Sequence, residues 1–156
     1  MRKTKLVDVT EQALTAGAGN LLSGVTTNLF DLELDITLGT ARYVTLNVID
    51  TSDAKLILTY DAKARVMNVT VKTAATYQES RIQGSVTPID GKISIRLVYD
   101  VSIFEIFVNR GEQSFHGMVF PDSTTLSMSL SVEGGEATVN SLDVWAMGSM
   151  YDKEAV

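Results

Sequence analysis

Short segments in which apolar and polar residues alternate dominate the sequence. The clearest covers residues 30–38 (FDLELDITL), where every second side chain is large and apolar and the others are mostly acidic. This period of two is typical of a β-strand that buries one face. Similar segments recur after small or polar turns, as consecutive strands do. We therefore predict strands at residues 30–38, 43–50, 55–61, 65–73, 79–87, 92–99, 103–109, 114–120, 125–132 and 138–147.

This series of strands predicts the fold class. The segment TEQALTAGA, residues 10–18, is the one weak helix candidate beside them. We predict an all-β chain, an antiparallel β-sandwich of two packed sheets of the jelly-roll or concanavalin-like kind, with about 10–12 strands. The length of 156 residues suits one domain with a sizeable core, so we expect a single β-sandwich domain over residues 1–156.

Composition and charge exclude several classes of partner. The net charge is -6 and no basic cluster exceeds the short MRKTK start, so nucleic acid and anionic membranes are not expected partners. An uncharged ligand such as a sugar is compatible with this balance. There is no cysteine, which excludes disulfides, thiolate metal sites and cysteine nucleophiles. No apolar signal-peptide segment follows the N-terminal charges, and we expect a cytoplasmic protein or a domain of a larger one.

The segment at residues 103–109 (IFEIFVN) has an unusual second face. One side of this predicted strand is purely apolar and suits the core. The other side carries Ile103, Glu105, Phe107 and Asn109, which places a carboxylate and an amide among large apolar side chains. Neither a buried face nor a solvated face normally has this mixture.

Two hairpins predict which residues lie beside this mixed face. If the dipeptide DV forms the first loop, Arg96 lies opposite Glu105, and every pair on the other face is apolar. The turn NRGE then places Glu105 opposite His116, the only histidine. We predict a row of Arg96, Glu105 and His116 with Phe107 and Asn109 at its edge, and these five residues are the candidate ligand-binding site.

Two interpretations of this face stay open. It can be a structural surface that contacts another domain or subunit, because cross-strand Arg–Glu pairs are common and contribute only about 0–1 kcal/mol. It can also be a sugar-binding site. In that case Arg and Glu bond to hydroxyl groups while an aromatic ring covers an apolar face of the sugar.

Catalysis is the least favoured interpretation. A glycosidase needs two carboxylates about 5–10 Å apart across a cleft. The acidic residues Asp31, Glu33 and Asp35 alternate on one strand face, and we interpret them as exposed, solubilising charge. His116 has no serine motif or second histidine with it, so we predict no catalytic residue.

A calcium site is an alternative at residues 50–53 (DTSD). Asp50, Asp53 and loop carbonyls could surround the ion, but calcium takes six to eight oxygen ligands. Two carboxylates in a turn more often cap the turn itself. We favour this structural interpretation and predict neither a metal site nor a cofactor.

The stretch LVYDVSIFEIFVNRGEQSF, residues 97–115, resembles a segment of the C-terminal β-sandwich of glycoside hydrolase family 32, which includes invertases, levanases and inulinases. The mid-chain LTYDAKARVMNV and the ending GGEATVNSLDVWAMGSMY are similar to the same domain. The residues in matching order and spacing are Asp100, Ser102, Glu105, Phe107, Asn109, Gly111 and Glu112. The family usually has an arginine after the matching aspartate, where this chain has Val101.

The resemblance implies an accessory, non-catalytic domain. The family's chemistry resides in a preceding five-bladed propeller with an NDPNG-type motif, which this sequence does not contain. Related sandwiches bind fructan, so a fructan-binding module is the leading functional hypothesis. The alternative is a structural module with no ligand of its own, whose partner is a glycoside hydrolase catalytic domain or a second copy of the chain.

Overall fold

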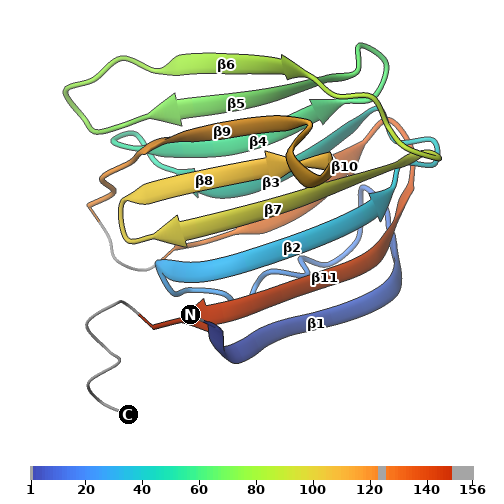
Figure 1. Ribbon diagram of the computed structural model, residues 1–156, viewed down its shortest axis with the longest axis horizontal. Coiled ribbons are helices and arrows are strands. Elements are labelled where there is room, and N and C mark those ends of the chain that lie inside the picture. Colours follow the sequence, from blue (N-terminus) through green and yellow to red (C-terminus); the bar gives the residue numbers. More distant parts are fainter. Residues whose placement is uncertain (1, 123–125, 149–156) are drawn as a thin grey trace.

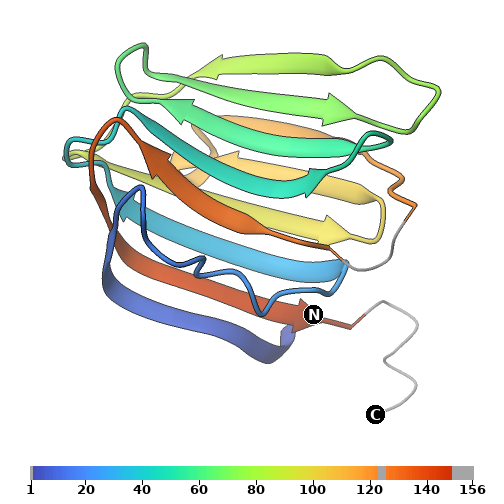
Figure 2. The same cartoon turned by 180° about the vertical axis from the view of Figure 1, so that it is seen from behind.

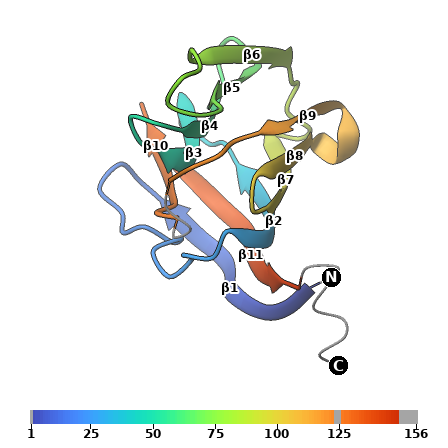
Figure 3. The ribbon, with the colours of Figure 1, turned by 90° about the vertical axis from the view of Figure 1, so that its left-hand side faces the viewer.

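The computed structural model describes residues 2–122 and 126–148, which fold into two antiparallel β-sheets packed face to face (Figure 1; Figure 3 shows the two layers from one end). The six-stranded sheet has the order β1-β11-β2-β7-β8-β9, and the five-stranded sheet has the order β10-β3-β4-β5-β6. The strands are β1 (Arg2–Leu14), β2 (Leu29–Thr37), β3 (Tyr43–Asp50), β4 (Lys55–Asp61), β5 (Val66–Lys72), β6 (Ser80–Ser85), β7 (Lys92–Asp100), β8 (Ile103–Val108), β9 (Gln113–Met118), β10 (Ser129–Glu133) and β11 (Ala137–Met147), and a short 3-10 turn, η1 (Asn109–Gly111), joins β8 to β9.

The predicted fold class is confirmed. The predicted strands at residues 43–50 and 55–61 coincide with β3 and β4, and the other predicted strands overlap their counterparts. The prediction for residues 125–132 overlaps β10 only in its second half, and its first residue lies outside the described residues. Period-two patterning succeeds because most strands bury one face against the opposite sheet.

Aromatic side chains fill the centre of the core. The rings of Phe30 and Tyr99 are stacked with centroids 5.7 Å apart, and both residues are fully buried. The ring of Phe104 lies over Gly117, where an added Cβ would come within 2.8 Å of Phe104 Cζ. Each such side chain contributes about 1.5–3 kcal/mol by leaving water.

The N-terminal strand β1 corrects the weak helix candidate. The helix considered at residues 10–18 is wrong, because residues 10–14 continue β1 along β11. Only Val7 and Leu14 of this strand are buried, since β1 is an edge strand and much of it faces solvent. No alternating pattern is therefore present to identify it, and pairing with β11 determines its conformation.

A single amide side chain bonds to the edge of the chain at the start of β10. Asn20, in the loop after β1, donates from Nδ2 to the carbonyl oxygen of Met128 over 2.7 Å. Its Oδ1 accepts hydrogen bonds from the backbone N–H groups of Leu22 and Leu130. The side chain thus supplies both a donor and an acceptor to the strand edge, as a neighbouring strand would (Figure 2, where this loop runs beside β10).

The first predicted hairpin has the wrong register. Asp100 pairs with Ile103, so the loop consists of Val101 and Ser102, and Arg96 lies opposite Phe107 rather than Glu105. A shift of two residues keeps every apolar side chain on the core face, so patterning cannot distinguish the two registers. The loop also requires a positive φ of 57° at Val101, which is unusual for a β-branched residue.

The second hairpin is confirmed. Glu105 lies opposite His116, Ile106 opposite Phe115 and Phe104 opposite Gly117, as predicted. The turn between these strands has positive φ at Asn109, Arg110 and Gly111. Only the glycine adopts such a conformation without steric cost.

Two buried tyrosines provide a matched test of the core. The Tyr60 hydroxyl donates to the carbonyl oxygen of Val86 over 2.6 Å, whereas the buried Tyr99 hydroxyl has no hydrogen-bond partner in the described part of the chain. Burial raises the pKa of Tyr99 to about 12. We expect Tyr60→Phe to lower the free energy of unfolding by about 1–2 kcal/mol and Tyr99→Phe to leave it unchanged or raise it, in urea titrations. Equal losses in both variants would contradict this assignment.

Candidate functional site

Four of the five predicted site residues share one surface. This outer face is the side of the six-stranded sheet that points away from the five-stranded sheet. Arg96 projects from β7, Glu105 and Phe107 from β8, and His116 from β9. Cross-strand pairing makes Phe107 the direct neighbour of Arg96, and Glu105 the neighbour of His116. These residues are brought together, although not in the predicted single row.

The fifth predicted residue, Asn109, has a structural role. Its Oδ1 accepts a hydrogen bond from the backbone N–H of Ser94, and its Nδ2 donates to the carbonyl oxygen of Thr87 and to Glu112. These bonds anchor η1 to β7 and to the segment after β6. The amide is therefore occupied within the protein, and a ligand would have to displace one of these bonds to use it.

A buried carboxylate organises the outer face. Asp31 is 2% exposed, and it accepts hydrogen bonds from Arg2 over 2.8 Å and from Arg96 over 3.2 and 2.9 Å. Burial alone would raise the pKa of Asp31, but hydrogen bonds and charge from Arg96 and Arg2 outweigh it and hold the pKa below its ordinary value. The interpretation of this residue as exposed, solubilising charge is wrong, because two arginines cover it.

Trp145 belongs to the same cluster. It pairs with Asp31 across β11 and β2, and the guanidinium carbon of Arg2 lies 3.6 Å from the centre of the indole ring. A guanidinium over an aromatic face is a favourable cation–π contact. Arg2 thus bonds to Asp31 and covers Trp145. These two contacts of Arg2 attach the start of β1 to β2 and β11 on the outer face.

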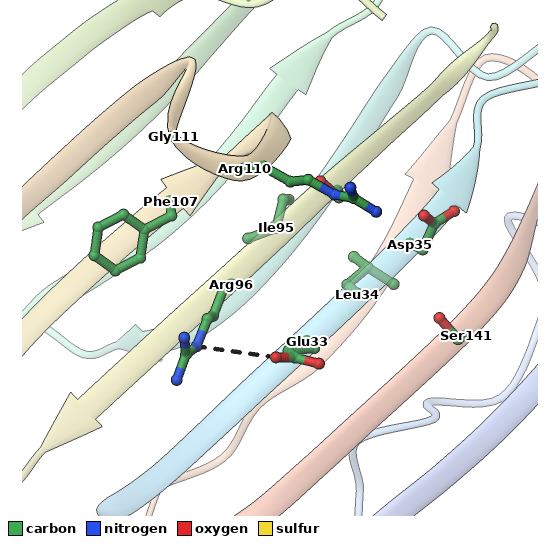
Figure 4. A pocket seen from close by; sticks show the side chains of 10 residues that line it. Glu33, Leu34, Asp35, Ile95, Arg96, Phe107, Arg110, Gly111 and Ser141 are labelled. Atoms are coloured by element: carbon green, nitrogen blue, oxygen red, sulfur yellow. Dashed lines mark ion pairs between the residues drawn. The ribbon is translucent and has the colours of Figure 1, made fainter. Parts of the chain in front are cut away.

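The arginine groove lies beside this cluster, over β2 and β7. It has a volume of about 540 Å³. Figure 4 shows the side chain of Arg110 extending from η1 across β7 toward Asp35, with Phe107 on the other side of Arg96. The residues that line the groove are Glu33, Leu34, Asp35, Ser94, Ile95, Arg96, Phe107, Arg110, Gly111 and Ser141.

Arg110 is placed by an unusual backbone conformation. Its φ of 58° and ψ of 35° lie in the left-handed region, which non-glycine residues seldom adopt. Its guanidinium has no hydrogen bond or ion pair with the described residues, so its donors face the groove unpaired. Left-handed residues of this kind are concentrated at binding sites and switches.

A second hollow, the histidine groove, lies over β8 and β9. It has a volume of about 470 Å³ and shares Phe107 with the arginine groove. Its polar groups include Glu105 and His116, and its apolar walls include Ile103 and Met118, which are 50% and 47% exposed. The described contacts include no ion pair between Glu105 and His116, which leaves both side chains available to a ligand.

Sequence reasoning missed the three other charged residues of the arginine groove: Glu33, Asp35 and Arg110. The two acidic residues lie on β2, which pairs with β7 although the two strands are far apart in the sequence. The prediction aligned only neighbouring hairpins and so did not include β2. A signal was available for Arg110, because it stands in the NRGE turn, but the direction of its side chain depends on the left-handed backbone.

The turn at residues 50–53 is capped by the hydroxyl group of Thr51 and not, as predicted, by the carboxylates of Asp50 and Asp53. Thr51 Oγ1 accepts hydrogen bonds from the N–H groups of Asp53 and Ala54 and donates to the carbonyl oxygen of Ala54. Asp53 also lies beside Asp122, and the hydrogen bond and like charge raise the pKa of Asp122. Within residues 2–122 and 126–148, no group of three or more histidine or acidic side chains is placed to hold a metal ion.

The outer face suits a neutral, hydroxylated ligand. In the arginine groove the carboxylates of Glu33 and Asp35 balance the guanidinium groups of Arg96 and Arg110. Carboxylates accept hydrogen bonds from hydroxyl groups, guanidinium groups donate to them, and a ring such as Phe107 covers C–H surface. No helix in the described part of the chain has the length and apolar character needed to cross a membrane.

Comparison with known proteins identifies the family. Residues 1–146 match the family described as "Glycosyl hydrolases family 32 C terminal", and the chain therefore belongs to this family. It is similar to a levanase of Bacillus sp. (strain L7), with 26% identity over 162 residues that cover 99% of this chain and 18% of the levanase. The chain thus spans less than a fifth of that relative.

Solved structures show the same fold. The β-fructofuranosidase of Schwanniomyces occidentalis superposes with a TM-score of 0.72 at 11% identity, over 96% of this chain and 34% of that one. Fructan 1-exohydrolase IIa of Cichorium intybus superposes with a TM-score of 0.70 at 12% identity, over 95% of this chain and 36% of that one. At these identities the likeness concerns the sandwich fold alone.

The Asp31 cluster predicts how stability depends on pH. The pKa of Asp31 is lower in the folded state than in the unfolded state, where it is about 3.9. The ionised Asp31 therefore contributes fully to the free energy of unfolding above the unfolded-state pKa, and this contribution is lost as the pH falls through the lower folded-state pKa. We expect Asp31→Asn to lower the free energy of unfolding at pH 7 by roughly 2 kcal/mol. This loss is smaller than the loss expected from breaking a fully buried ion pair, because the side chains of Arg2 and Arg96 both reach solvent. Chemical denaturation at pH 7 and at several pH values below 4 measures both effects.

The control for this prediction is Glu33→Gln. Glu33 also bonds to Arg2, but its side chain is 45% exposed, so we expect Glu33→Gln to lower the free energy of unfolding at pH 7 by only about 0–1 kcal/mol. The Asp31→Asn variant should show a flatter loss of stability in acid than the wild type. An unchanged acid profile in Asp31→Asn would show that Asp31 does not contribute through its charge.

Proposed function

We propose that this chain is an accessory β-sandwich that binds neutral carbohydrate of the fructan class through the arginine groove. The observation that carries the proposal is the unpaired guanidinium of Arg110, which a left-handed backbone holds over the sheet and which extends toward Asp35 in the groove that Glu33, Arg96 and Phe107 also line. If the turn only connected β8 to β9, glycine would suit position 110 better, because glycine adopts the left-handed conformation without steric cost. An arginine there supplies donors to the groove.

The other groups of the groove are arranged for the same ligand. Arg96 bonds to Asp31 through Nε and Nη2, which fixes the guanidinium and leaves Nη1 without a partner in the described residues. Glu33 and Asp35 supply acceptors along β2. Groups whose orientation is fixed before binding lose less conformational entropy when the ligand arrives.

Family membership supports fructan as the ligand class. The named relatives are a levanase, a fructan exohydrolase and a β-fructofuranosidase. The chain matches only a part of each of these proteins. A domain that holds the polymer beside a separate active site fits this arrangement, and it does not require catalytic residues in the sandwich.

Arg110→Gly tests the proposal without threatening the fold. Glycine adopts the left-handed conformation without strain, so the variant should be at least as stable as the wild type. It loses the charged donor, and we expect affinity for levan and inulin oligomers to fall about tenfold in calorimetric titrations. Thermal unfolding of the same samples provides the stability control, and Phe107→Ala provides an independent loss of the aromatic contact.

The proposal fails if the wild-type chain shows no heat of binding with any fructan at millimolar concentrations. It also fails if Arg110→Gly binds with unchanged affinity. Gln83→Ala is the matched surface control, because Gln83 is an exposed residue on β6 of the other sheet. This control should bind as the wild type does.

A structural module without a ligand is the second candidate function. Four apolar side chains gather near the turn from β7 to β8 and the end of β9, and about half of each is exposed: Val101, Ile103, Met118 and Phe120. Exposed apolar groups of this kind typically mark protein contacts. Such a surface suits a catalytic domain of the family or a second copy of the chain.

Sedimentation separates this second function from the first. If these four apolar side chains form a contact surface, the chain should self-associate or co-sediment with a family propeller supplied separately. The double substitution Ile103→Ser, Met118→Ser should then weaken the association. Loss of the contact should raise the dissociation constant about tenfold or more, because two half-buried apolar side chains each contribute on the order of 1 kcal/mol. A wild-type chain that remains monomeric and does not co-sediment with the propeller would exclude this role.

A further inference from the structure

Phe107 is common to both grooves of the outer face. It lines the arginine groove on the side of β7 and the histidine groove on the side of β9. The two hollows are therefore neighbours that meet at one aromatic side chain. The four strands β2, β7, β8 and β9 are consecutive in the sheet, and at about 4.8 Å per strand the combined surface extends for roughly 14 Å across them.

The histidine groove has the same kind of lining as the arginine groove. Glu105 supplies an acceptor and His116 a ring nitrogen that can donate or accept, and the two lie directly opposite each other. Ile103 and Met118, also paired across β8 and β9, provide apolar contact at the side. As in the arginine groove, charged or polar groups are combined with apolar surface, which suits the alternating hydroxyl and C–H faces of a sugar.

We propose that both grooves bind one ligand, an oligosaccharide that runs across the strands with Phe107 beneath its middle part. This inference rests on the proposed function and extends it, because it assigns the ligand a minimum length. A monosaccharide ring is about as wide as one strand spacing and fills only one groove. An oligomer of three or more units reaches Arg110 at one end and His116 at the other.

The place of β9 in the sheet leaves one end of the proposed path open. β9 is an edge strand of the six-stranded sheet, so no further strand of that sheet blocks the chain beyond His116. The lining charges also match a neutral polymer, because acidic and basic side chains alternate along the path: Glu33 and Asp35, then Arg96 and Arg110, then Glu105. A charged polymer would meet repulsion in one part of this path.

Chain-length dependence of binding tests the inference. Calorimetric titrations with fructose and with fructo-oligosaccharides of two to five units are compared for the wild type and for His116→Ala. In the wild type we expect affinity to rise about tenfold between the shortest and the longest ligands, because only the longer ligands also contact the histidine groove. His116→Ala should abolish most of this gain. Glu105→Gln, which keeps the size of the side chain, should reduce it as well.

The outcomes separate the inference from the proposed function. No binding of any ligand refutes both. Binding that depends on Arg110 but does not strengthen with ligand length refutes the shared ligand and leaves the arginine groove as a site for one sugar unit. A gain with length that survives both His116→Ala and Glu105→Gln places the longer ligand elsewhere and also refutes the inference. Thermal unfolding of each variant, with Gln83→Ala as the surface control, shows that the differences arise from the site.

Discussion

The outer face of the six-stranded sheet depends on one buried carboxylate. Asp31 is surrounded by Arg2 from the first strand and Arg96 from β7, so three strands that are distant in the sequence meet at a single charge. Removing a carboxylate from water costs several kcal/mol unless its hydrogen bonds are satisfied. Here two guanidinium groups satisfy them, and the same contacts fix the direction of Arg96 beside Phe107.

This arrangement divides the charged side chains of the outer face into two sets. The inner side of the sheet is a conventional core, whose side chains alternate with those of the outer face along each strand. On the outer face, Asp31 and the arginines beside it are already bonded to one another, whereas Arg110, Glu105 and His116 project without ion pairs to described residues. The first set holds the surface in shape, and the second set is free to contact other molecules.

Much of the fold could be predicted from sequence, and the limits have physical causes. Alternation identified β3 and β4 to the residue, because burial imposes a period of two. It could not identify β1, which is an edge strand with two buried residues. Nor could it choose between hairpin registers two residues apart, which placed Arg96 opposite Glu105 instead of Phe107. Side-chain patterns are the same in both registers, and the observed register requires a positive φ at Val101, which a β-branched residue seldom adopts.

The side chain of Asn20 has a consequence for the protein in concentrated solution. Sheets grow by adding strands to open edges, and chains with exposed edges can stack into fibres. At β10 an amide group occupies backbone positions that a strand from a neighbouring molecule would need. The side chain of Asn20 therefore contributes to the protection of that border against polymerisation, together with the backbone of the same loop, where Thr26 accepts a hydrogen bond from the N–H of Leu126.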